Sequence, residues 1–185
     1  TLEEAGWVVE MADAARVKAL APLTAKTDRI DARVLAELSR RDLIPGVWLP
    51  SPGVRGMREL ARFRLHLVRH RTALKNRIHS SLITWGISVP MSDLFGAGGR
   101  DYLEHLDFPE AWRETVATTL KVIDHLDTHI TDYERRLAHA AEAVPEVGLL
   151  QTAPGIGPIL GFTIASEIGD ITRFPDRNHF ASWTG

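Results

Sequence analysis

The stretch "RELARFRLHLVRHRTALKNRIHSSL", residues 58–82, predicts a long helix because its apolar residues repeat at helical spacing. Leu60, Leu67 and Leu74 lie seven residues apart and so share one face of the helix. The apolar stripe continues on both sides, and we expect the helix to run from about Val54 to Trp85. This helix is the longest feature before the middle of the chain, and it predicts a mainly helical fold.

The same stretch is strongly basic. Eight lysines and arginines between Arg55 and His79 stand against a single acid, Glu59, although the whole chain has a net charge of −2. A segment of this kind favours a polyanionic partner such as a nucleic-acid backbone. The alternative is a solvated helix face, but such faces usually mix both signs of charge. The candidate contacts are Arg55, Arg58, Arg62, Arg64, Arg69, Arg71, Lys75 and Arg77.

A second long helix is predicted from Pro109 to about Val144. Its apolar residues are spaced alternately by three and four, which is the pattern of a coiled-coil seam. The two long helices could pair with each other, with a second copy of the chain, or with both. Residues 88–108 between them, which include "GAGG", are predicted to be rich in loops.

The N-terminal part has the pattern of an α/β fold. "GWVVEMAD", residues 6–13, predicts a strand, and "AARVKALA" after it predicts a short helix. Another helix is expected from Thr27 or Asp28 to about Arg41. The Pro/Gly-rich connector "LIPGVWLPSPG" then predicts a domain boundary.

Asp28 and Asp31 are candidate metal ligands at the start of that helix. Residues three apart share a face of a helix, so both carboxylates could approach one Mg²⁺ ion. Acids in a first helical turn also cap free N–H groups and complement the helix dipole. From the residues alone, the capping interpretation is the more common one.

The segment "PGIGP", residues 154–158, predicts a tight turn between two apolar helices. Gly155 and Gly157 would let a phosphate approach the backbone, and Pro158 would begin the next helix. This is the arrangement of a helix-hairpin-helix that binds a nucleic-acid backbone. The alternative is a plain helix–helix turn in which Gly157 and Gly161 only permit close packing.

Three other features point away from particular functions. The chain has no cysteine, which excludes disulfides and Cys-based zinc sites. The uncharged run 147–166 could span a bilayer by length, but its prolines and glycines would leave backbone groups unpaired in lipid, so we expect no membrane segment. Two histidine pairs at i, i+4 spacing lack the H-E-x-x-H pattern, and a metal role is not favoured for them: His66/His70 and His125/His129.

In this order, the features resemble the DEDD-type transposases of bacterial insertion sequences, the insertion-sequence 110 family that includes the bridge-RNA-guided recombinases. The resemblance is strongest at "KTDRIDARVLAEL", at the basic helix and at "APGIGPILGFTIASEIGDITRF". It implies a mainly α fold: a remnant of an RNase H/RuvC-like α/β domain, then long helices forming a coiled coil, then a helix-hairpin-helix-like α domain. The implied parts are residues 1–44, a linker at 45–53, residues 54–144 and residues 145–185.

The resemblance also implies a chemistry. Asp28 and Asp31 would be the last two of four acids that hold Mg²⁺ or Mn²⁺ for DNA strand cleavage and exchange, and Lys26 and Arg29 would join the nucleic-acid contacts. The first two acids are expected upstream of Thr1 and a serine nucleophile beyond the C-terminal end. The chain alone is therefore expected to be inactive. Three residues do not match the family's missing positions: Glu10, Ser166 and Ser182.

The implied partners are DNA, a guide RNA and a second copy of the chain that pairs through the coiled coil, in the bacterial cytoplasm. Two other functions stay open on the sequence. One is a non-catalytic nucleic-acid-binding helical scaffold. The other is a protein-interaction helical bundle whose basic face is incidental.

Overall fold

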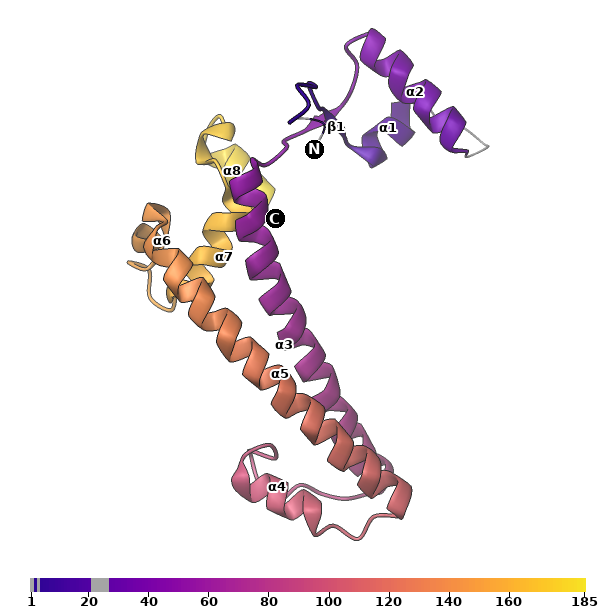
Figure 1. The fold of residues 1–185 in the computed structure, drawn as a ribbon, viewed down its shortest axis with the longest axis vertical. Helices are drawn as coiled ribbons and strands as arrows, with labels where there is room; N and C mark the ends of the chain where they lie inside the picture. The colour runs from indigo at the N-terminus through magenta and orange to yellow at the C-terminus, as the bar shows by residue number, and fades with distance from the viewer. Residues whose placement is uncertain (1, 3, 21–26) are drawn as a thin grey trace. The chain divides into compact units, whose positions relative to one another are not determined.

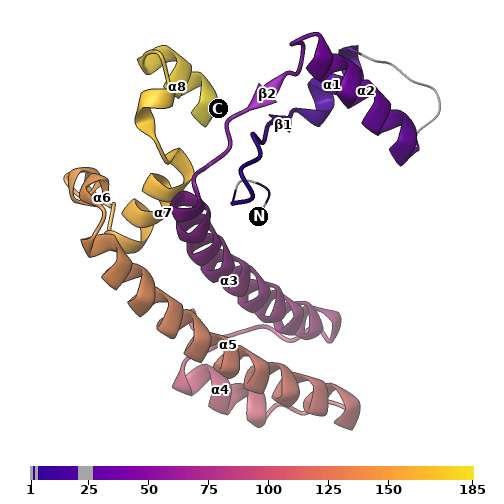
Figure 2. The ribbon, with the colours of Figure 1, turned by 45° about the horizontal axis from the view of Figure 1, so that its top comes forward.

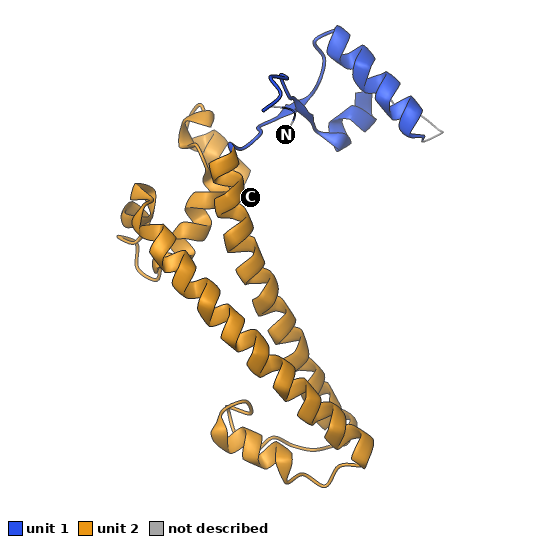
Figure 3. Cartoon of the chain, viewed as in Figure 1, with its two compact units in different colours: residues 1–51 blue, residues 52–185 orange. Residues whose placement is uncertain are grey.

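The computed structural model describes residues 2, 4–20 and 27–185. The chain divides into two compact units, residues 1–51 and residues 52–185 (Figure 3). The described residues are mainly helical, as predicted, and their strands are two short pieces of two residues each. Each unit is considered separately below.

The strands of the first unit are shorter than the sequence predicts. β1 (Met11–Ala12) pairs antiparallel with β2 (Gly46–Val47), with Met11 opposite Val47. The rest of the predicted strand over residues 6–13 forms no ladder within the described residues, and Val8 is 92% exposed. A β-branched run needs a neighbouring strand to pair with and a surface to cover it, and here β2 reaches only two residues of it.

Two helices complete the first unit. α1 (Ala14–Leu20) begins where the carboxylate of Asp13 accepts hydrogen bonds from the N–H groups at the helix start. α2 (Asp28–Arg40) confirms the predicted helix and ends in a turn with Asp42 at a φ of 55°. The apolar side of α2 is half-buried at best, and none of its residues is buried.

The second unit is built on a helical hairpin. α3 (Pro52–Thr84) and α5 (Glu110–Glu142) run side by side in opposite directions (Figures 1 and 2). Two ring contacts show how the helices are aligned. Trp85 contacts Trp112 near the turn of the hairpin, and Phe63 contacts Tyr133 nearer its open end. The two long helices therefore pair with each other, which is one of the alternatives that the sequence left open.

α3 ends as its glycine predicts. Gly86 has a φ of 65°, a conformation that side-chain-bearing residues rarely adopt. The N–H of Ile87 donates to the carbonyl of Leu82 at 2.9 Å, and the N–H of Gly86 donates to Ile83 at 3.0 Å. These two bonds form a Schellman motif, which satisfies the last carbonyls of the helix.

Residues 88–108 are rich in loops, as predicted, but they also contain a helix that the sequence did not predict. α4 (Ala97–Glu104) forms within them and lies across the turn of the hairpin (Figure 1). Its glycines argued against a helix, since glycine is a poor helix former. However, a Cβ at Gly99 would clash with the backbone of Leu94, so the close packing of α4 on the preceding loop requires glycine there.

The C-terminal part packs against the open end of the hairpin. α6 (Pro145–Leu150) and α7 (Pro158–Ile168) flank the predicted turn, and α7 contacts both α3 and α5. A 3₁₀ turn, η1 (Ile171–Arg173), leads to α8 (Arg177–Thr184), whose first N–H groups donate to the Asp176 carboxylate. The stretch "FPDRNHFASWTG", residues 174–185, by itself predicts such a short helix, because Asp176 is a preferred N-cap residue, and the structure confirms it.

Two separate apolar clusters hold the second unit together. The cluster at the hairpin turn joins α3, α4 and α5 and includes Ile78 and Ile123. The cluster at the open end joins α3, α5, α6 and α7 and includes Leu137 and Phe162. Charged pairs link the two helices along the stretch between these clusters.

The described helices include none with the length and the apolar composition needed to cross a membrane. The uncharged run 147–166 is divided between α6, a turn and α7.

Candidate metal centre and nucleic-acid surface

The two candidate metal ligands lie in the first turn of α2, and another residue caps that helix. Thr27 has an extended backbone, and its hydroxyl accepts a hydrogen bond from the N–H of Ile30 at 3.3 Å. Asp28 and Asp31 are exposed, and neither carboxylate has a hydrogen bond or an ion pair among the described residues. Because Thr27 supplies the cap, both carboxylates are available to a cation.

The pair fits part of a magnesium or manganese site. Mg²⁺ commonly takes one or two carboxylates and completes its shell with water and phosphate oxygens. Among the described residues no group of three or more His, Cys, Asp or Glu side chains is arranged to hold a metal. Further protein ligands would therefore have to come from outside the part of the chain that the structure describes.

The two histidine pairs are each joined internally. The Nε2 atoms of His66 and His70 lie 2.9 Å apart, and those of His125 and His129 lie 3.2 Å apart. All four side chains are exposed. The pairs do not combine into a larger ligand group within the described residues.

Arg58 of the basic helix holds the end of α7. Its Nε donates to the carbonyl of Ser166 at 2.8 Å and its Nη2 donates to the carbonyl of Glu167 at 2.7 Å. The Nε of Arg173 donates to the next carbonyl, Ile168, at 3.2 Å. Cations at a helix C-terminus satisfy orphan carbonyls and complement the helix dipole. Arg58 is therefore a structural contact between α3 and α7.

Arg62 forms a bidentate ion pair with Glu167. Its Nε and Nη2 atoms lie 2.6 Å from Oε1 and 2.6 Å from Oε2 of the carboxylate. The hydrogen bonds from Arg62 lower the pKa of Glu167, and the same contact raises the pKa of Arg62. The Arg62 side chain nevertheless remains 60% exposed.

Two more arginines of α3 pair with acids on α5. Arg64 pairs with Glu134, and Nη1 of Arg71 lies 2.6 Å from Oδ1 of Asp127. These arginines cross-link the hairpin between its two apolar clusters. The acids come from a helix more than 50 residues later in the chain, so counting charges along α3 alone could not reveal the pairing.

The remaining predicted nucleic-acid contacts differ in their exposure and in their partners. Arg29, Arg69 and Arg77 are exposed and have no ion pair within the described residues. Lys75 is half-buried, with its ammonium 4.7 Å from the centre of the Phe95 ring. Two predicted contacts remain. Arg55 is half-buried and has a partner of its own, and Lys26 lies outside the described residues.

The "PGIGP" turn is exposed and its glycines differ in role. Gly155 has a φ of 87°, which favours glycine, whereas Gly157 is extended and begins α7. A Cβ at either position would meet open space, but a Cβ at Gly161 would lie 3.0 Å from Cγ1 of Val147. Gly161 is thus the packing glycine, and the backbone at Gly155 and Gly157 is open to a ligand.

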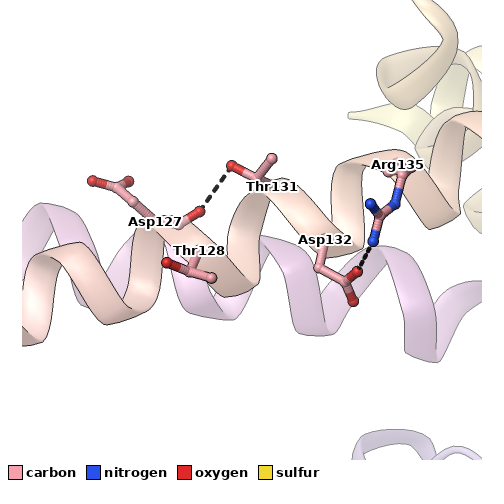
Figure 4. A pocket seen from close by; sticks show the side chains of 5 residues that line it. All are labelled: Asp127, Thr128, Thr131, Asp132 and Arg135. Atoms are coloured by element: carbon pink, nitrogen blue, oxygen red, sulfur yellow. Dashed lines mark hydrogen bonds and ion pairs between the residues drawn. The ribbon is translucent and has the colours of Figure 1, made fainter.

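A shallow hollow on α5 is not a candidate ligand-binding site. It is lined by Asp127, Thr128, Thr131, Asp132 and Arg135 (Figure 4). The Thr131 hydroxyl donates to the carbonyl of Asp127 at 2.9 Å, and Arg135 pairs with Asp132. The other two polar side chains also have partners, because Asp127 pairs with Arg71 and the Thr128 hydroxyl donates to the carbonyl of Asp124.

Comparisons with known proteins find similarity to transposases of insertion sequences. A family model described as "Transposase" matches residues 2–85, and one described as "Transposase IS116/IS110/IS902 family" matches residues 147–185. The transposase for insertion sequence element IS1111A of Coxiella burnetii is 28% identical over 170 residues, which cover 86% of this chain and 45% of the relative. The transposase for insertion sequence element IS1328 of Yersinia enterocolitica is 27% identical over 86% of this chain and 48% of the relative.

The acid pair and the basic helical hairpin thus lie in a chain of the insertion-sequence transposase class. The chain belongs to the IS110 family of these transposases, which confirms the resemblance. It spans about half the length of the curated relatives that it matches.

Proposed function

We propose that this chain is part of a transposase that binds DNA and catalyses metal-dependent strand cleavage and exchange. The observation that carries the proposal is the acid pair of α2. Thr27 caps the helix, and Asp28 and Asp31 stand exposed on one face without an ion pair among the described residues, within a segment that matches a transposase family model. Two carboxylates on one face of a helix, with no partner in the described residues to compete for them, are suited to bind a cation.

Asp28 and Asp31 would hold Mg²⁺ or Mn²⁺, together with the other two acids of a DEDD set in an RNase H/RuvC-like domain. A bound ion would supply activation of the attacking oxygen and stabilisation of the leaving oxygen of a phosphodiester. The chain's own carboxylates would orient the site. The further ligands would come from beyond the described residues, because these contain no group of three or more acids or histidines arranged to hold a metal.

The nucleic acid would be held mainly by the cations that the fold leaves exposed. Arg69 and Arg77 project from α3, and Arg29 follows the first acid of α2. The open backbone at Gly155 and Gly157 would accept a phosphate in the manner of a helix-hairpin-helix. A guide RNA and a second copy of the chain, paired along the long helices as a coiled coil, complete the proposal, and it places the protein in the bacterial cytoplasm.

The test substitutes Asp28 with Asn in the full-length protein and measures both strand cleavage with Mg²⁺ and binding of a branched DNA substrate. We expect cleavage to fall at least about 100-fold with binding retained, because a lost metal ligand removes catalysis and not backbone contacts. Glu37→Gln is the matched control, since Glu37 lies on the same helix and pairs with Arg40 and Arg41.

Each outcome separates the candidates. Cleavage that Asp28→Asn leaves unchanged would favour the non-catalytic scaffold. Binding that does not weaken as salt is raised would favour a protein-interaction bundle, because backbone contacts release counterions.

A further inference from the structure

We propose that Glu167 is an intramolecular competitor for a phosphate site on α3 formed by Arg62 and Arg69. The carboxylate would occupy the place that a phosphate group of the nucleic-acid backbone takes when the protein binds its polyanion. The inference rests on the proposed function, since it concerns the affinity of the same basic surface.

The contact between Arg62 and Glu167 has the geometry that a phosphate would adopt. Two parallel hydrogen bonds of 2.6 Å join the guanidinium to the two carboxylate oxygens. The planar donor fork of arginine fits a carboxylate and a phosphate in the same bidentate way. With 60% of its side chain exposed, Arg62 can be reached by an anion from solvent while the pair is formed.

A second cation lies beside the pair. Arg62, Arg69 and Glu167 line one open hollow of about 590 Å³, together with His66 and Glu59. Arg69 lies seven residues after Arg62 and so on the same face of α3, and it has no ion pair within the described residues. A phosphate that enters the hollow would meet Arg69 and could replace the carboxylate at Arg62.

The carboxylate of Glu167 can leave without undoing the fold. The carboxylate also lies 3.7 Å from Nε of Arg58, but Arg58 donates in addition to the backbone carbonyls of Ser166 and Glu167, so the end of α7 stays on α3 when the side chain turns away. The arginines that pair with α5 are less accessible to an anion from solvent than Arg62. The side chain of Arg64 is 25% exposed and that of Arg71 is 29% exposed. An exposed ion pair also contributes little to stability, so exchanging it costs little.

The experiment measures binding of the full chain to a fluorescein-labelled duplex of about 20 bp, as DNA and as RNA, across a salt series. We expect Glu167→Gln to bind about 3- to 10-fold more tightly near 100 mM salt, because Arg62 is no longer engaged. The slope of log K against log salt should steepen by about 0.9, the value for one added phosphate contact on a duplex. The duplex whose affinity rises identifies the polyanion.

Three variants make the test specific. Glu59→Gln removes the same charge from the same hollow without releasing the Arg62 fork, and we expect a smaller gain from it. Arg62→Ala combined with Glu167→Gln should abolish the gain, and Arg69→Ala should weaken binding in either background.

A Glu167→Gln gain no larger than that of Glu59→Gln, or one that persists without Arg62, would overturn the inference. If the unsubstituted chain binds neither duplex in a salt-dependent way, the proposed function itself is wrong. If it binds but Glu167→Gln changes nothing, only the inference is wrong.

Discussion

Arginines of the same helix have different tasks, and their partners decide which. Arg58 caps α7, and Arg71 links α3 to α5, whereas Arg69 is exposed without an ion pair in the described part of the chain. A guanidinium that satisfies buried carbonyls contributes to stability, while an exposed one contributes to ligand affinity. The basic pattern of α3 therefore combines structural arginines with exposed ones, to which we assign the proposed nucleic-acid contacts.

Replacing Arg58 with Ala should lower the free energy of unfolding by about 2–3 kcal/mol, because two carbonyls at the end of α7 lose a charged donor. Urea denaturation followed by circular dichroism measures this loss. Arg69→Ala is the control and should change stability by no more than about 0.5 kcal/mol. Equal losses in the two variants would show that Arg58 does not support α7.

At the scale of elements, glycines decide where helices approach closely. Gly99 permits α4 to pack on the loop before it, and Gly161 permits α7 to pack on α6. Neither task shows in helix propensity, which counts glycine as unfavourable wherever it stands in a helix.

Gly161→Val should destabilise the chain by about 1–3 kcal/mol, because the added carbons would press on Val147. Thermal and urea unfolding measure the change. Gly148→Val makes the same substitution inside α6, where a Cβ would meet open space, and should be neutral or slightly stabilising. A loss of the same size at Gly148 would mean that the packing argument does not hold.

At the scale of the second unit, two apolar clusters stabilise the opposite ends of one hairpin. Ile123 is fully buried in the cluster at the turn, and Leu137 is fully buried in the cluster at the open end. α3 and α5 continue through both clusters. Each cluster can therefore affect the other only through the lengths of helix between them. This separation predicts that substitutions in the two clusters change the free energy of unfolding independently of each other.

Ile123→Val should cost about 0.5–1.5 kcal/mol and Leu137→Ala about 2–5 kcal/mol, from lost burial and the cavities left behind. The double variant should lose the sum of the two to within about 0.5 kcal/mol, since the sites share no cluster. Urea unfolding of all four proteins gives the comparison. A larger coupling would show that the two clusters act as one core.

The local features of this protein follow from its sequence. The spacing of apolar residues predicts both long helices, Gly86 predicts the end of the first, and Asp176 predicts the cap of the last, because each signal acts within a few residues. The candidate metal ligands were also found from the sequence, through the motif "KTDRIDARVLAEL" and its family resemblance.

Only the tertiary structure decided which of these features meet. It brings Glu134 to Arg64 and Glu167 to Arg62 from helices far along the chain, and so divides a uniform run of cations into structural and exposed ones. It also forms α4 against its own propensity and pairs α3 with α5. Contacts between distant residues depend on how helices pack, and one-dimensional spacing does not record that packing.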